Sequence, residues 1–209
     1  MLRLAATASL VFSVVFLSME ILKTFSFGKK RLYAEPRADG RKGVLFAFGL
    51  GMMPWEKESA SKHLPTYTGG IVYHAGIFAG FFCLLSVIVP FGLPQPLVAV
   101  FRILFVLSLL SGLALLARRI IAPALKAISC PDDFASNILV DLFLLSAFLN
   151  TLSAGVSALF LILSIVMLLY IPFGKIRHCF FFFYVKVLFG LFFGRRGVLP
   201  PETRGLKHG

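Results

Sequence analysis

The chain has 209 residues, of which 58% are hydrophobic and 14% are charged, and its formal net charge is +12. A soluble domain of this size carries roughly a quarter charged residues, so the composition excludes most soluble enzymes and soluble nucleic-acid-binding domains. The basic residues lie between long apolar runs, which indicates an integral membrane protein and no nucleic-acid partner.

Five apolar segments are each long enough to cross a bilayer, whose hydrocarbon core needs about 20 helical residues. We therefore expect an all-α fold, an integral membrane five-helix bundle. The first segment ends without a small-residue cleavage site, so we interpret it as a helix and not as a signal peptide. In chain order, the predicted spans are residues 5–22, 70–90, 97–117, 134–150 and 154–177.

The distribution of Lys and Arg predicts the orientation of these spans. Loop 23–69 holds nine basic residues, the loop after the third span holds three, and the chain from residue 175 holds seven. The short loops 91–96 and 151–153 hold none. Because basic loops stay in the cytoplasm, we expect the amino terminus outside and the carboxyl terminus inside, in the inner (cytoplasmic) membrane of the cell.

The sequence is divided into a five-span domain, residues 1–178 with cytoplasmic loop 23–69, and a carboxyl-terminal segment, residues 179–209. Within that segment, residues 180–193 hold seven Phe and one Tyr but also Lys186. This pattern favours a helix that lies in the membrane interface or contacts a partner.

Two of the four histidines are predicted at the cytoplasmic boundary: His74 one turn inside the second span, and His178 at the end of the fifth. Neutral imidazole is a standard axial ligand of haem iron, and two antiparallel helices can supply one ligand each. Gly174, one turn before His178, would leave room for a flat ring. Equally, both histidines could be boundary residues that bind headgroups or carbonyls. Four cations at this boundary could offset haem propionates: Arg118, Arg119, Lys175 and Arg177.

The residues around both histidines are Tyr73-His74-Ala75-Gly76-Ile77 and Ile171-Pro172-Phe173-Gly174-Lys175-Ile176-Arg177-His178. They resemble the ligand segments of the respiratory nitrate reductase gamma-subunit family, a di-haem membrane cytochrome b with heterodisulfide-reductase-like relatives. The resemblance covers residues 5–25 and 70–180, in the same five-span order. It implies a membrane-anchoring, b-type cytochrome subunit that transfers electrons between the quinone pool and a cytoplasmic iron–sulfur partner.

The sequence departs from that family at the second haem. Where the family places its other two histidine ligands, this chain has Leu84 and Phe160, and neither side chain binds iron. The resemblance therefore implies a single haem b held by His74 and His178, in a redox subunit without a substrate-reducing site of its own.

Asp141 lies inside the fourth predicted span, where an ionisable residue is a functional candidate. It could relay a proton for quinone chemistry, or it could be a hydrogen-bonded packing residue. Arg102 is expected to extend to the outer headgroups, and His63 and His208 are expected to have surface roles.

Two other functions remain open from the sequence. The chain could be a haem-free membrane anchor or a transporter component of a multi-subunit complex. It could also be a basic membrane scaffold for nucleic acid or anionic lipid, acting through Lys29-Lys30-Arg31 and Arg195-Arg196.

Overall fold

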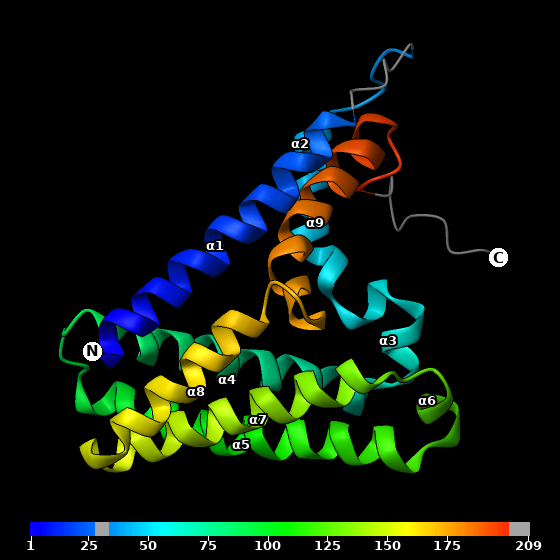
Figure 1. The fold of residues 1–209 in the computed structure, drawn as a ribbon. Helices are drawn as coiled ribbons and strands as arrows, with labels where there is room; N and C mark the ends of the chain where they lie inside the picture. Colours follow the sequence, from blue (N-terminus) through cyan, green and yellow to red (C-terminus); the bar gives the residue numbers. More distant parts are fainter. Residues whose placement is uncertain (28–33, 201–209) are drawn as a thin grey trace. The chain divides into compact units, whose positions relative to one another are not determined.

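The computed structural model describes residues 1–27 and 34–200, and these residues form only helices and loops (Figure 1). The predicted all-α class is confirmed. In chain order, the helices are α1 (Leu2–Ser26), α2 (Gly40–Phe48), η1 (Leu50–Met52), η2 (Pro54–Glu56), α3 (Glu58–Lys62), α4 (Leu64–Ile88), α5 (Gln95–Ile121), α6 (Pro123–Ala127), α7 (Pro131–Leu152), η3 (Ala154–Val156), α8 (Ser157–Tyr170), η4 (Lys175–Arg177) and α9 (His178–Arg195).

Within the described residues, five helical segments are long and apolar enough to cross a membrane, as expected of a multi-pass membrane protein. Four of them, α1, α4, α5 and α7, correspond to the first four predicted spans, with α4 ending two residues before the predicted residue 90. The fifth is Lys175–Arg195 and consists of η4 and α9. The predicted span 154–177 is instead the 14-residue α8 with short 3₁₀ turns at its ends, and the predicted interfacial helix 180–193 lies within α9.

The break after α8 has a local cause. Pro172 has no backbone N–H to donate, and the N–H groups of Phe173 and Gly174 both donate to the Tyr170 carbonyl, at 3.0 and 2.9 Å. The chain turns there before η4. With 14 residues, α8 is about 21 Å long, which is shorter than the roughly 30 Å hydrocarbon core of a bilayer.

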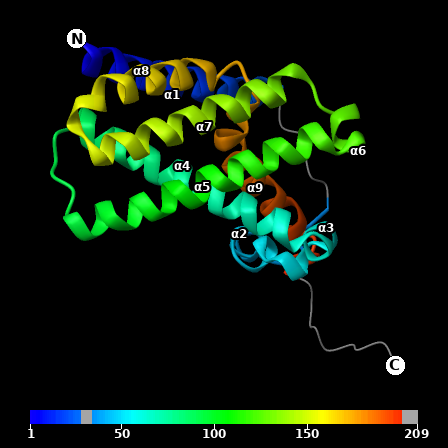
Figure 2. The same cartoon turned by 90° about the horizontal axis from the view of Figure 1, so that it is seen from below.

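The chain divides into two compact units, each described by itself. Unit 1 comprises residues 1–17 and 65–177, and unit 2 comprises residues 18–64 together with the chain from residue 178. In unit 1, α4, α5, α7 and α8 lie side by side (Figure 2). The first half of α1 joins α8, since the Ser13 hydroxyl donates to the Leu168 carbonyl.

The core of unit 1 combines large rings with small residues. Phe105, Phe143 and Phe160 are fully buried, and the rings of Phe143 and Phe160 lie 5.7 Å apart. On α4, a Cβ added to Gly76 would lie 2.1 Å from the Ser108 hydroxyl, and one added to Gly80 would lie 2.6 Å from the Phe143 ring. Glycine at both positions therefore lets α4 pack closely against α5 and α7.

In unit 2, α2 and α9 are joined through their backbones. A Cβ on Gly43 would lie 2.2 Å from the Gly190 carbonyl oxygen and 2.6 Å from the Gly194 Cα. Residues 190 and 194 form a G-x-x-x-G pair, a spacing that places two small residues on one helix face and lets a second backbone approach closely. Glycine at these positions is what permits the pairing.

Candidate functional site

His74 lies on a face of α4 that is exposed in unit 1. Its Nδ1 is 2.7 Å from the carbonyl oxygen of Gly70, one turn earlier. As a hydrogen bond, this contact assigns the proton to Nδ1 and the lone pair to Nε2. Metal-binding histidines commonly have this arrangement, in which a carbonyl orients the ring.

The surface around His74 is apolar. Ile71 lies three residues before it and Phe78 four residues after it, so both share its helix face. Their exposed fractions are 54% and 59%. Among the described residues no group of three or more His, Cys, Asp or Glu could hold a metal ion. A haem would need only two histidines from the protein. An imidazole between two exposed apolar side chains can meet either a porphyrin plane or lipid.

His178 is the exposed first residue of α9 and belongs to unit 2. Arg177 precedes it at the end of η4, exposed and in unit 1. The two predicted axial ligands are thus described in separate units, His74 in unit 1 and His178 in unit 2.

Gly174 does not leave an open space in the structure. A Cβ added there would lie 2.3 Å from the ring of Tyr170 and 2.8 Å from its hydroxyl. The Tyr170 hydroxyl donates to the Asp132 carboxylate and lies 3.0 Å from the Ser136 hydroxyl. The space expected for a flat ring is therefore occupied by this tyrosine.

Two of the predicted propionate partners have other contacts. Arg118 donates to the Thr66 hydroxyl at 2.8 Å. Arg119 donates to the Ser129 hydroxyl at 3.0 Å and lies 3.3 Å from a carboxylate oxygen of Asp133.

Arg119, Asp133 and Lys175 form an ion-pair cluster that was not predicted from the sequence. The Lys175 ammonium lies 2.6 Å from Asp133, and the Lys175 backbone N–H donates to Asp132 at 2.8 Å. These contacts tie the end of α5 and the turn after α8 to the first turn of α7. Two consecutive acids at the start of a helix are the signal that could have indicated it, because acids there stabilise the helix end.

Asp141 belongs to a buried polar cluster with Tyr73 and Asn137. The Tyr73 hydroxyl donates to Asp141 Oδ1 at 2.8 Å, and the Asn137 amide donates to Asp141 Oδ2 at 3.0 Å. Asp141 is 6% exposed, and a Cβ on Gly112 would lie 2.1 Å from its Oδ1. The cluster joins α4, α5 and α7, so Asp141 has the contacts of a packing residue.

Arg102 contacts the end of α7. Its guanidinium donates to the backbone carbonyl of Thr151 and, at 3.3 Å, to the Thr151 hydroxyl. Carbonyls in the last turn of a helix have no partner within the helix, and a cation there also complements the helix dipole. The structure therefore gives Arg102 a capping contact, whereas the sequence predicted that it extends to headgroups.

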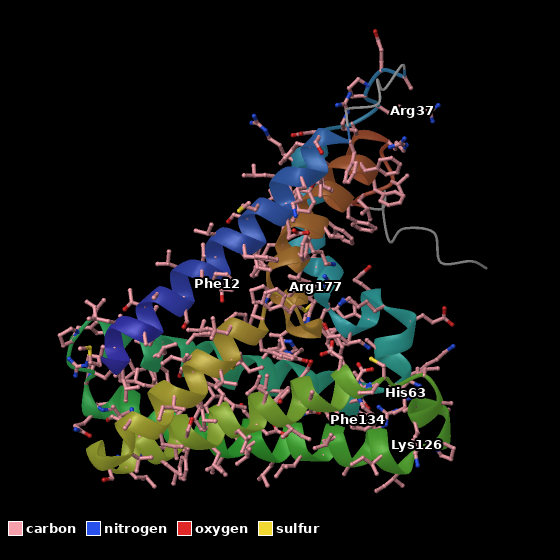
Figure 3. All side chains as sticks on the ribbon, viewed as in Figure 1. Phe12, Arg37, His63, Lys126, Phe134 and Arg177 are labelled. Atoms are coloured by element: carbon pink, nitrogen blue, oxygen red, sulfur yellow. The ribbon has the colours of Figure 1, made fainter. Side chains whose placement is uncertain are left out.

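The remaining residues singled out in the sequence are placed as follows. Leu84 and Phe160, which stand where the resembled family has its second ligand pair, are buried in the core of unit 1. His63 is exposed at the junction of α3 and α4 (Figure 3). His208 and Lys29-Lys30-Arg31 lie outside the described residues.

Comparison with protein-family models, curated proteins and solved structures finds no match to this chain. The resemblance of the two histidine segments to the nitrate reductase gamma-subunit family stays a prediction.

Proposed function

We propose that this chain is a membrane-anchoring, b-type cytochrome subunit with one haem b, which His74 and His178 would hold. In this proposal electrons pass between the quinone pool and a cytoplasmic iron–sulfur subunit. The observation that carries it is the setting of His74: its Nδ1 is held by the Gly70 carbonyl, and its helix face is apolar. Haem b supplies one-electron chemistry, with a potential tuned by its axial ligands and its burial.

The chain's own residues would orient and shield the group. The Gly70 carbonyl fixes the ring of His74 and leaves Nε2 as the atom that would bind the iron. Ile71 and Phe78 would exclude water from the ligand. Arg177, next to His178 in sequence and exposed, would offset a propionate.

The buried polar cluster has a positioning role in this proposal. Tyr73 is adjacent to His74 in sequence but points into the bundle, where it is bonded to Asp141 and Asn137. These bonds fix the rotation of α4 about its axis. The rotation in turn decides the direction in which His74 points, so Asp141 acts through Tyr73 on the ligand.

A haem-free membrane anchor of a larger complex is the second candidate. Two observations favour it: Tyr170 occupies the space beside Gly174, and Arg119 is paired with Asp133. In that case His74 would contact lipid at the helix surface.

The two candidates are distinguished by the absorption spectrum of the full-length protein purified in a mild detergent. We expect a dithionite-reduced minus oxidised spectrum of b-type haem in the wild type. His74→Ala and His178→Ala should each lose this spectrum, because a bis-histidine haem needs both ligands.

His63→Ala is the matched control, since it removes an exposed imidazole outside the proposed ligand pair and should keep the full spectrum. Helix content by circular dichroism checks that each variant is folded. A haem spectrum that survives in both the His74 and the His178 variants would refute the ligand assignment. If the wild type contains no haem after expression with sufficient haem, the cytochrome proposal is refuted and the haem-free anchor is supported.

A further inference from the structure

One end of unit 2 collects basic side chains from distant parts of the sequence. α2 and α9 run antiparallel, with Gly40 beside Arg195 and Gly43 beside Gly190. The first turn of α2 therefore lies beside the last turn of α9. The backbone N–H of Arg37 donates to the Arg195 carbonyl at 2.8 Å, which holds Arg37 at the same end (Figure 3). This basic cluster consists of Arg37, Arg41, Lys42, Arg195 and Arg196.

The basic cluster has an excess of positive charge. The nearby carboxylates are Glu35 and Asp39, so five cations and two acids give this end a net charge of +3. The Asp39 carboxylate already accepts the Arg41 backbone N–H at 2.8 Å and caps α2. Among the residues that the structure describes, no ion pair involves a member of the cluster.

The flank next to the basic cluster is apolar. Val185, Phe189 and Phe192 are spaced three or four residues apart on α9, so they share one helix face, and all three are exposed in unit 2. At the end of this helix the guanidinium of Arg196 stacks on the Phe192 ring, 3.4 Å from its centroid, and donates to the Phe192 carbonyl at 3.1 Å. An apolar helix that ends in arginines is typical of a segment whose end lies at headgroup level.

We infer that the basic cluster binds the headgroup of an anionic phospholipid. The guanidinium groups match a phosphodiester in charge and in hydrogen-bonding geometry, while the apolar flank of α9 would contact the acyl chains of the same lipid. A nucleic acid or an acidic protein would complement the positive charge but would leave the apolar flank of α9 exposed. Clusters of four or more Lys and Arg beside a membrane helix commonly bind anionic lipids.

The test is lipid competition on the full-length protein in detergent, with bound lipid read by native mass spectrometry. Phosphatidylglycerol and phosphatidylcholine with identical acyl chains are offered at equal concentrations. We expect a preference for phosphatidylglycerol in the wild type. In the Arg195→Gln/Arg196→Gln variant this preference should fall at least about tenfold, because each basic residue near an anionic surface strengthens binding by roughly fivefold.

Two further variants distinguish binding at the basic cluster from attraction by the net positive charge of the whole protein. Arg3→Gln/Lys126→Gln removes two exposed cations of unit 1 and should keep the preference. Arg195→Lys/Arg196→Lys keeps the charge and should retain most of it. If the glutamine variant of α9 fails to fold, Arg41→Gln/Lys42→Gln tests the same cluster from α2.

The inference is overturned if the α9 glutamine variant binds phosphatidylglycerol as the wild type does, or if the unit 1 control loses the preference equally. It is also overturned if a short DNA duplex displaces the lipid at equal phosphate concentration. None of these outcomes depends on haem, so this proposal and the cytochrome proposal fail separately.

Discussion

The two units of this protein join their helices by different physical means. Unit 1 combines large buried rings with a polar cluster of Tyr73, Asn137 and Asp141, in which side chains from α4 and α7 bond across the bundle. Unit 2 joins α2 to α9 through close backbone contacts at Gly43, Gly190 and Gly194, and the Phe48 ring packs against the rings of Phe182 and Phe183.

The difference matters because lipid removes the usual driving force for association. Between helices in a bilayer there is little hydrophobic gain, so close packing and interhelical hydrogen bonds stabilise the contact. Unit 1 uses both, whereas the α2–α9 pair depends on close packing. A single added methyl group should therefore damage unit 2 more than the loss of a single hydroxyl damages unit 1.

Gly43→Ala should have the largest effect. Its Cβ would lie 2.2 Å from the Gly190 carbonyl oxygen, and neither backbone can yield as a flexible side chain would. We expect a loss of about 2–3 kcal/mol in the stability of the α2–α9 pair. Trypsin should then cleave after Arg41 or Lys42, in the first turn of α2, about 30- to 160-fold faster than in the wild type.

Gly92→Ala is the control for this experiment, because no atom lies within 4 Å of the Cβ that it adds. Its cleavage rate should equal that of the wild type. If Gly43→Ala were cleaved no faster than Gly92→Ala, close backbone packing would not hold α2 to α9.

Tyr73→Phe should have an intermediate effect, confined to unit 1. The variant removes a hydroxyl that donates to Asp141 and accepts from Asn137. Hydrogen bonds between membrane helices contribute about 1 kcal/mol, which corresponds to a fall of about 2–4 °C in Tm. Cys83, on α4 and 2% exposed, reports unfolding through its reaction with a thiol dye in a Cys130→Ser/Cys179→Ser background.

A double-mutant cycle with Asp141→Asn isolates the bond itself. We expect a coupling of about 1 kcal/mol between positions 73 and 141; strictly additive effects would show that the two side chains do not interact. Tyr184→Phe, which removes a hydroxyl in unit 2 that contacts Thr24, should leave the Cys83 signal unchanged.

Asp133→Asn should have the smallest effect. Asp133 contacts Arg119 and Lys175, but the side chains of both cations are partly exposed, at 35% and 50%. We expect a Tm about 2 °C lower at low ionic strength, and no difference in 1 M NaCl, because salt screens such pairs. The exposed pair of Glu58 and Lys62 provides the control: Glu58→Gln should not change the Tm. An equal loss at both salt concentrations would point to packing and not to charge.

Hydropathy and length were sufficient to predict the all-helical class and four of the five membrane-length helices. They failed at the boundary between α8 and α9. The run 154–177 is apolar throughout, but Pro172 and the turn at Tyr170 end the helix early. Lys186 in α9 favoured an interfacial segment, although a single cation does not prevent a helix of this length from crossing.

The contacts between distant residues were only partly predictable. Asp141 stood out because a carboxylate within an apolar span needs partners, but its partner Tyr73 lies 68 residues away. The same holds for the pair of Asp133 and Lys175, 42 residues apart. The G-x-x-x-G spacing of Gly190 and Gly194 is visible in the sequence, whereas its complement on α2 becomes evident only when the two helices are seen together.

We propose that this membrane protein carries one haem b between two histidines. The most direct measurement is the molar ratio of haem to chain in the purified wild type, by pyridine haemochrome absorbance against quantitative amino-acid analysis. We expect a ratio of one. A ratio near zero would contradict the haem assignment, and a ratio of two would contradict the single ligand pair of His74 and His178.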